Sequence, residues 1–193
     1  CSVVPVHFHS HPFVSRASQE KVRELCEVLT RYQMHTTLRL VPFGELQRQV
    51  VLSVPAPLRV VIYRRLMLRI AERIARASRA KALVTGEVIG QVASQTLENL
   101  TVIADATSMP ILRPLVGTDK EEIVAEAMRI GTYEISIVPD QDCCQLFTPR
   151  SPETHARRWQ VEEAEAKLPI EDMVRAAVEA TATEEFRFPP PTS

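Results

Sequence analysis

Two hydrophobic periods alternate along the chain. Within residues 18–32, apolar side chains occupy the i, i+3, i+4 and i+7 positions of an amphipathic helix, as at Val22, Leu25 and Leu29. Residues 36–41 alternate instead with the period of two that is typical of a strand. Over the whole sequence these patterns predict strands at residues 3–8, 36–41, 82–84 and 111–115, and helices at 18–32, 43–54, 58–80, 91–105, 120–130 and 157–180.

The order of these elements indicates the fold class. Strands that alternate with helices favour an α/β fold with a doubly wound, mainly parallel sheet. We expect residues 1–155 to form this domain, and residues 156–193 to form a helical extension with a frayed tail from Phe186 onward. Such sheets bind ligands at the carboxyl ends of their strands. The stretches at those ends are residues 7–9, 85–87 and 113–120.

Composition narrows the class of protein. The 193 residues are 45% hydrophobic, which is enough to bury the core of one domain and excludes disorder for most of the chain. No stretch approaches the ~20 consecutive apolar residues of a membrane span, and no membrane partner is expected. No three of the five glycines lie within a few residues of one another, which excludes a dinucleotide fingerprint and a Walker phosphate loop. The net charge of −1 means that any site for a polyanion must be local.

The cysteines suggest both a compartment and a chemistry. Four cysteines are too few for a disulfide scaffold, so we expect a protein of the reducing cytoplasm. Cys143 and Cys144 are adjacent, which fits no common zinc spacing. They either have no role or supply a thiolate for nucleophilic or redox sulfur chemistry. Because the neighbouring Asp142 disfavours a thiolate, an activating cation such as Lys120 would have to come from elsewhere.

Lys120 lies in the first turn of a predicted helix that Asp119 caps. Asp119 and Glu122 have the spacing of a capping box, with Asp in place of Ser. The helix dipole disfavours a cation at this end by ~0.3–1 kcal/mol. Lys120 is therefore either a surface lysine offset by its acidic neighbours, or part of an anion site that it forms with the helix N-terminus. A nucleotide phosphate would fit such a site.

Residues 58–80 contain a row of arginines on one helical face. Arg65, Arg69, Arg73 and Arg76 follow i, i+4 and i+3 spacing. The row is either the solvated face of an amphipathic helix or a basic stripe for RNA or nucleotide phosphates.

Three histidines occupy alternate positions from the end of the first predicted strand onward. His7, His9 and His11 share one side of an extended segment, as zinc ligands do, but no local carboxylate or cysteine joins them. His7 and Phe8 at the end of the strand are better placed to contact a nucleotide base.

A glycine also follows the third predicted strand. Gly86 would allow a ligand to approach the backbone closely, and Gln95 offers an amide early in the next helix. A plain strand-to-helix turn is the alternative.

Taken together, the motifs resemble the ThiI family of tRNA 4-thiouridine synthetases, specifically its C-terminal PP-loop ATP pyrophosphatase domain. The resemblance covers nearly the whole chain. The run GQVASQTLEN is long and specific, and the matching stretches are residues 7–10, 63–67, 86–99, 112–115, 119–123, 131–132 and 142–144.

This resemblance implies a function and roles for single residues. The implied reaction adenylates a uridine of tRNA at O4 and then replaces AMP by sulfur from a cysteine persulfide. ATP, accompanied by Mg²⁺, would be held by His7 and Phe8 from the first strand. Lys120 would serve the activation step, and Cys144 would be the catalytic cysteine. The rest of the ATP pocket would be formed by Arg64, Gly86 and Gln95.

The resemblance also implies partners. They are tRNA, a cysteine desulfurase as sulfur donor, a sulfur-carrier protein of thiamine thiazole synthesis, and a second copy of the chain in a homodimer. The family's phosphate loop, Ser-Gly-Gly-x-Asp-Ser, would come ahead of Cys1, as would its THUMP region, and we expect the chain to be an N-terminally truncated form of the domain. Two alternatives stay open: a non-catalytic nucleotide- or protein-binding module, and another PP-loop ligase or thiolase.

Overall fold

The computed structural model describes residues 1–90, 92–139, 147, 149 and 151–190. It divides the chain into two compact units. The first unit comprises Cys1–Gly44, Asp119–Cys143 and Ala180–Ser193, and the second comprises Glu45–Thr118 and Cys144–Glu179. Each unit is therefore assembled from separate stretches of the sequence.

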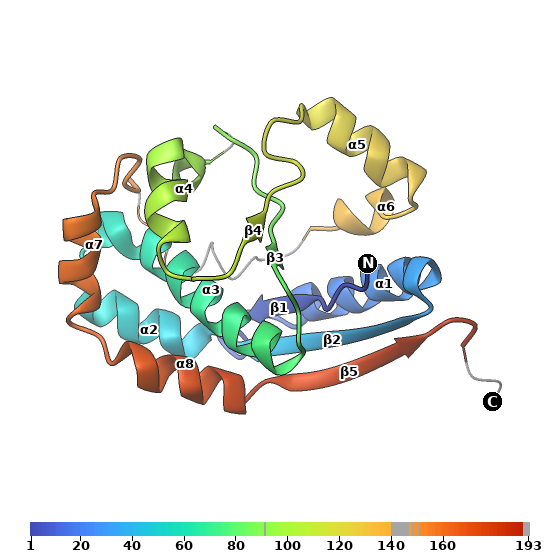
Figure 1. Ribbon diagram of the computed structural model, residues 1–193, viewed down its shortest axis with the longest axis horizontal. Helices are drawn as coiled ribbons and strands as arrows, with labels where there is room; N and C mark the ends of the chain where they lie inside the picture. Colours follow the sequence, from blue (N-terminus) through green and yellow to red (C-terminus); the bar gives the residue numbers. More distant parts are fainter. Residues whose placement is uncertain (91, 140–146, 148, 150, 191–193) are drawn as a thin grey trace. The chain divides into compact units, whose positions relative to one another are not determined.

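The first unit is built on a three-stranded sheet. Strand β1 (Val6–His9) pairs in parallel with β2 (His35–Pro42), and β5 (Ala182–Arg187) pairs antiparallel with the other edge of β2. Helix α1 (Ala17–Gln33) connects β1 to β2, because parallel neighbours need a crossover. Figure 1 shows β2 between β1 and β5.

The core of this unit lies between α1 and the sheet. Leu38 and Leu40 of β2 are buried against Cys26 of α1, and Val22 and Phe186 pack around them. The same unit contains α5 (Lys120–Arg129) and α6 (Tyr133–Ser136), and α6 packs against α1.

The second unit is organised around one long helix. Helix α3 (Arg59–Ala77) contacts α4, α7 and α8, so it is buried on several faces (Figure 1). The second unit also contains a short two-stranded parallel sheet, formed by β3 (Leu83–Val84) and β4 (Ile111–Leu112). The other elements are α2 (Gly44–Ser53), the 3₁₀ helices Ala56–Leu58 and Ala93–Gln95, α4 (Leu97–Ala104), α7 (Arg158–Glu165) and α8 (Ile170–Glu179).

Several predicted elements differ in the structure. The first strand begins at Val6 rather than at residue 3, and the α-helix predicted from residue 91 begins at Leu97. The helix predicted over 157–180 is two helices, because Pro169 cannot continue the first of them. Phe186 and Arg187 are not frayed, since they belong to β5, which the sequence analysis missed. The division at residue 155 stays a prediction. Among the described residues, no helix is both long and apolar enough to cross a membrane.

The arginine row of α3 serves the packing of the second unit. Arg65 is buried, and both Arg65 and Arg69 bond the carboxylate of Glu165 in α7. Arg73 pairs with Glu171 of α8 at 2.5 Å. Burial alone would raise the pKa of Glu165, but hydrogen bonds from Arg69 and Arg65 outweigh burial and lower it. Arg65 and Arg69 therefore form neither a solvated face nor a basic stripe for phosphates, because both are paired with Glu165 of the neighbouring helix α7.

Another carboxylate, that of Glu72 in α3, links this helix to the segment before β4. Glu72 accepts hydrogen bonds from Arg76 at 2.6 Å, from the Thr107 hydroxyl at 2.6 Å and from the Ser108 hydroxyl at 3.0 Å. Burial would raise the pKa of Glu72, yet the bonds from Thr107, Arg76 and Ser108 lower it from 4.5 to about 2. The folded state therefore favours the ionised carboxylate more than the unfolded chain does.

We expect this shift to produce acid-dependent stability. A carboxylate with a depressed folded-state pKa contributes fully above its unfolded value of 4.5 and loses its contribution as pH falls toward 2. The shift corresponds to about 3 kcal/mol at most. Unfolding free energies measured between pH 6 and pH 2 should show a shallower acid loss in Glu72→Gln, which starts from lower stability. The exposed Glu163→Gln is the control, and equal acid slopes in wild type and Glu72→Gln would contradict the assignment.

Candidate functional site

A buried carboxylate lies where β3 and β4 end. Glu87, three residues after β3, accepts hydrogen bonds from Arg64 of α3, from Arg113 Nε at 2.5 Å and from the Thr85 hydroxyl at 2.9 Å. Arg113 directly follows β4, whose parallel pairing with β3 brings the two strand ends together. These four residues, Arg64, Thr85, Glu87 and Arg113, are called the Glu87 cluster below.

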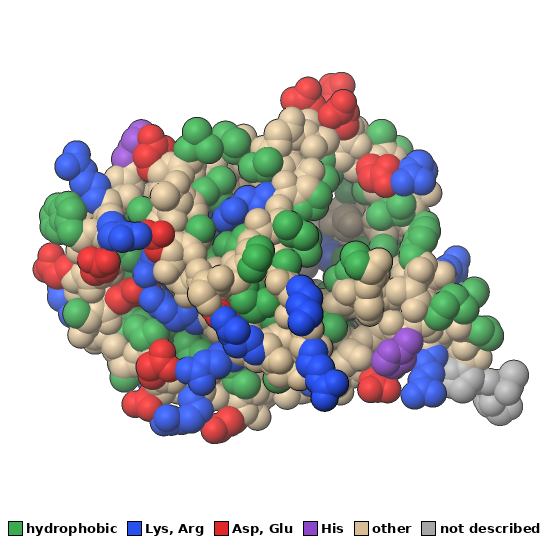
Figure 2. Space-filling view, viewed as in Figure 1, with side chains coloured by type: hydrophobic (Ala, Val, Ile, Leu, Met, Phe, Trp, Pro, Cys, Tyr) green, Lys and Arg blue, Asp and Glu red, His purple; other side chains and the backbone are tan. Residues whose placement is uncertain are grey.

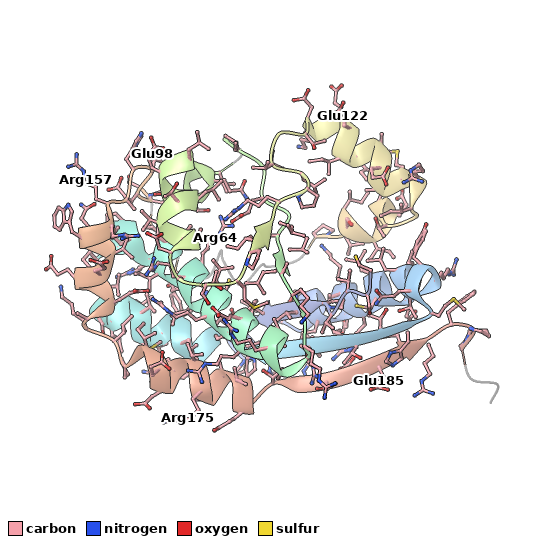
Figure 3. The ribbon with its side chains drawn as sticks, in the orientation of Figure 1. Arg64, Glu98, Glu122, Arg157, Arg175 and Glu185 are labelled. Carbon is pink, nitrogen blue, oxygen red and sulfur yellow. The ribbon has the colours of Figure 1, made fainter. Side chains whose placement is uncertain are left out.

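The Glu87 cluster carries a net positive charge. Two guanidinium groups face one carboxylate, and their side chains are 16% and 21% exposed while that of Glu87 is 5% exposed. Arg64 also donates to the Ser94 hydroxyl at 3.1 Å. Figure 3 shows Arg64 between α4 and β4. The cluster is therefore a local cationic site at the carboxyl ends of two parallel strands, where α/β sheets bind ligands.

Gly86 adds open space between Thr85 and Glu87 of the cluster, and Gln95 has an unpaired acceptor one residue after Ser94, the partner of Arg64. A Cβ built on Gly86 would meet no atom within 4 Å, so packing within the described protein does not require glycine there. Gln95 follows Ser94, the partner of Arg64, and its buried Oε1 has no hydrogen-bond partner among the described residues. A buried acceptor without a donor costs free energy, which a ligand N–H would recover.

Thr96 and Asn99 of the GQVASQTLEN run have a structural role. The Thr96 hydroxyl caps α4 at Asn99 N and donates to Thr154 O at 2.6 Å. The fully buried Asn99 side chain donates to Glu153 O at 2.7 Å and accepts from Ala156 N at 3.0 Å. This part of the run therefore anchors residues 153–156.

His7 and Phe8 lie in β1 of the first unit. His7 Nε2 is 3.3 Å from the Ser18 hydroxyl. The Phe8 ring packs edge-on against Phe43, with ring centroids 5.5 Å apart. Burial, followed by the charges of His11, Arg23 and Arg16, lowers the pKa of His9. Phe8 thus uses its ring for packing, which leaves the backbone of β1 as the part that would contact a ligand.

Lys120 is the first residue of α5, as the sequence predicts. Its side chain is exposed, and within the described part of the chain it has no ion-pair partner. Acidic side chains cover this end of α5, where Figure 2 shows them and Figure 3 labels Glu122. The predicted capping box is not formed, because Asp119 makes no side-chain cap bond.

The end of α5 matches its prediction. Gly131 has φ +77°, a left-handed conformation that favours glycine, and its N–H donates to Met128 O.

The predicted catalytic cysteine, Cys144, and its neighbour Cys143 lie outside the described residues. The other two cysteines are free thiols. Burial, with a smaller contribution from Glu184, raises the pKa of Cys26 to about 11, so this thiol is poorly suited to act as a nucleophile. Cys1 is exposed.

The predicted site residues fall into two sets. The second unit contains Arg64, Gly86 and Gln95, and within it Arg64 contacts Glu87, the residue after Gly86. The first unit holds the other set, which is His7, Phe8 and Lys120. Among the described residues, no three His, Cys, Asp or Glu side chains are arranged to hold a metal ion, and His7, His9 and His11 do not form such a group.

Comparison with known proteins decides the family. Residues 1–170 match the family model described as "Thiamine biosynthesis protein (ThiI)". The chain belongs to the ThiI family. The resemblance noted in the sequence is thereby confirmed, and the match covers both units.

Two relatives of the ThiI family support the assignment. A "Probable tRNA sulfurtransferase" of Thermus thermophilus is 53% identical over 187 residues, which are 97% of this chain and 46% of the relative. A crystal structure of a 4-thiouridine synthetase in complex with RNA and with bound ATP superposes with a TM-score of 0.91 at 42% identity, over 96% of this chain and 49% of the other. The chain thus spans about half the length of each relative, and the α/β fold class is confirmed.

Two charged residues of the Glu87 cluster were not recognised from sequence. Glu87 and Arg113 were noted only as members of strand-end stretches. A glutamate directly after a glycine at one strand end, together with an arginine at the next, is the signal that points to them. The pairing of Glu87 with Arg64 and Arg113 could not be read from spacing, because the two arginines lie 23 and 26 residues from Glu87.

Proposed function

We propose that this chain forms the ATP-binding and sulfur-transfer part of a tRNA uracil 4-sulfurtransferase. The observation that carries the proposal is the Glu87 cluster, a cationic site at the ends of two parallel strands. The relatives support it, because one is described as a probable tRNA sulfurtransferase and the other is a 4-thiouridine synthetase in complex with RNA and with bound ATP.

The residues of the second unit fit an adenine nucleotide. Arg64 supplies a charge for phosphate, and the open space at Gly86 admits a ligand close to the backbone. Gln95 Oε1 needs a donor, which the amino group of adenine would supply. For the first unit, a contact of the β1 backbone at His7 and Phe8 with the nucleotide is part of the same proposal. Mg²⁺ would accompany the triphosphate.

The proposed chemistry divides between Lys120 and Cys144. Adenylation of the uridine O4 builds negative charge on phosphate oxygens, and the exposed Lys120 ammonium would stabilise that charge. Replacement of AMP by sulfur needs a soft nucleophile, which a persulfide on Cys144 would provide: its outer sulfur would attack C4 and displace AMP. A second thiol would then attack the Cys144 sulfur and break the S–S bond, which frees 4-thiouridine and leaves a disulfide that a thiol reductant reopens.

The partners follow from this chemistry. The substrate would be tRNA, and a cysteine desulfurase would load the persulfide. A sulfur-carrier protein of thiazole synthesis and a second copy of the chain are further proposed partners. The protein would act in the cytoplasm, where thiols stay reduced.

The test uses the complete gene product that contains this sequence. Incubated with ATP, Mg²⁺, unmodified tRNA and a cysteine desulfurase with cysteine, it should form 4-thiouridine, as measured by mass spectrometry of the digested nucleosides. Omission of ATP should stop the reaction. Binding of ATP without turnover would contradict the proposal and favour a non-catalytic nucleotide-binding module.

A further inference from the structure

The second unit contains two carboxylates that each receive two arginines, and they differ in one respect. Glu165 accepts from Arg65 at 2.8 and 3.0 Å and from Arg69 at 2.5 and 2.9 Å. The remaining terminal nitrogen of Arg65 donates to Val102 O. All three nitrogens of Arg65 are thus engaged within the protein, as expected of a purely structural ion pair.

Arg113 is bound in the opposite way. It reaches Glu87 through Nε alone. Among the residues that the structure describes, its terminal nitrogens Nη1 and Nη2 have no hydrogen-bond partner, and 21% of the side chain is exposed. These terminal nitrogens belong to the planar fork of donors that binds phosphate oxygens in pairs. Glu87 therefore fixes the inner edge of the guanidinium and leaves its outer donors unused.

The charge balance favours an anion at this position. A buried carboxylate is costly unless it is paired, and Glu87 has two cationic partners where one would neutralise it. The surplus positive charge lies at the ends of β3 and β4, beside the open space at Gly86. An anion of the size of a phosphate group would neutralise the surplus and occupy the free donors of Arg113.

We infer that Arg113 is a second phosphate ligand for the nucleotide and that Glu87 is the positioning residue that holds Arg113 and Arg64 toward it. The inference rests on the proposed function, because it takes ATP as the ligand. It assigns a phosphate contact to Arg113 and a task to Glu87 that do not follow from the roles of Arg64, Gly86 and Gln95.

Nucleotide binding to the complete gene product tests Arg113. Calorimetry with ATP and with adenosine separates phosphate contacts from base contacts. Arg113→Gln should weaken ATP binding by about 10-fold or more, while adenosine binding stays within about 2-fold. Arg69→Gln, which removes an arginine from Glu165, is the matched control and should change neither affinity. An unchanged ATP-to-adenosine preference in folded Arg113→Gln would overturn the inference.

Three further variants keep the test decisive if Arg113→Gln does not fold. Arg113→Lys keeps the charge but lacks the fork, so it should weaken ATP binding by about 3-fold or more, and wild-type affinity would overturn the inference. Glu87→Gln should raise KM for ATP in ATP–pyrophosphate exchange more than it lowers kcat, because two phosphate ligands lose their positioning, with partial rescue in Glu87→Asp. A purely structural Glu87 would change stability without this kinetic signature.

Failure of the inference is distinguishable from failure of the proposed function. The preference for ATP over adenosine needs no turnover, whereas the proposed function fails if the wild-type protein makes no 4-thiouridine.

Discussion

Serine in place of Cys144 is expected to reduce 4-thiouridine formation by about 10³-fold or more, because a hydroxyl cannot carry the persulfide sulfur. ATP–pyrophosphate exchange should continue at close to the wild-type rate, since uridine activation does not use the thiol. Both quantities are measured on the complete gene product, with nucleoside mass spectrometry for sulfur transfer and labelled pyrophosphate for activation.

The other cysteines provide the controls. Cys1→Ser replaces an exposed free thiol and should leave both activities unchanged. Cys143→Ser tests whether the neighbouring thiol shares the role. A Cys144→Ser protein that still forms 4-thiouridine would refute the assignment of sulfur transfer to Cys144.

Alanine in place of Lys120 is expected to impair the first step, uridine activation, which Cys144→Ser leaves intact. Loss of a cation that stabilises developing charge on phosphate costs about 10²- to 10³-fold in rate, so ATP–pyrophosphate exchange and thiolation should fall together. Because Lys120 is exposed and has no ion-pair partner in the described part of the chain, its removal should leave the unfolding temperature nearly unchanged.

A second exposed lysine, Lys81, is the control that separates the effect of losing Lys120 from the effect of losing any one positive charge. Lys81→Ala removes one positive charge from an exposed position after α3 and should leave exchange at the wild-type rate. Lys120→Arg, which keeps the charge, should recover part of the activity. Normal exchange in Lys120→Ala would remove this residue from the proposed machinery.

Sequence pattern predicts the features of this fold that depend on local chemistry. The spacing of apolar residues predicts α1, and the left-handed Gly131 marks the stop of α5 two residues after its last residue, Arg129. The parallel pairing of β1 with β2 follows from the helix between them. Each of these features is encoded within a few consecutive turns or strands.

Features that depend on distant partners were not predictable in the same way. Strand β5 is a charged edge strand whose main apolar anchor is Phe186, and its identity comes from pairing with β2. Arg65 has the spacing of a solvated residue and becomes buried because α7 presents Glu165 to it. For the candidate site, the residue types were recognisable, but the carboxylate that orients the two arginines was not.

The position of β5 in the sequence has a consequence for the order in which the molecule can be completed. Arg23 of α1 bonds Glu184 of β5 across 161 positions, and Phe186 closes the core that Leu38 begins. During synthesis, the β1–β2 pair therefore emerges long before its third strand and carries an unpaired edge until residues 182–187 arrive. Closure over such a separation is entropically slow. The first unit, which carries His7, Phe8 and Lys120, therefore gains its third strand only after the residues of the second unit have been made.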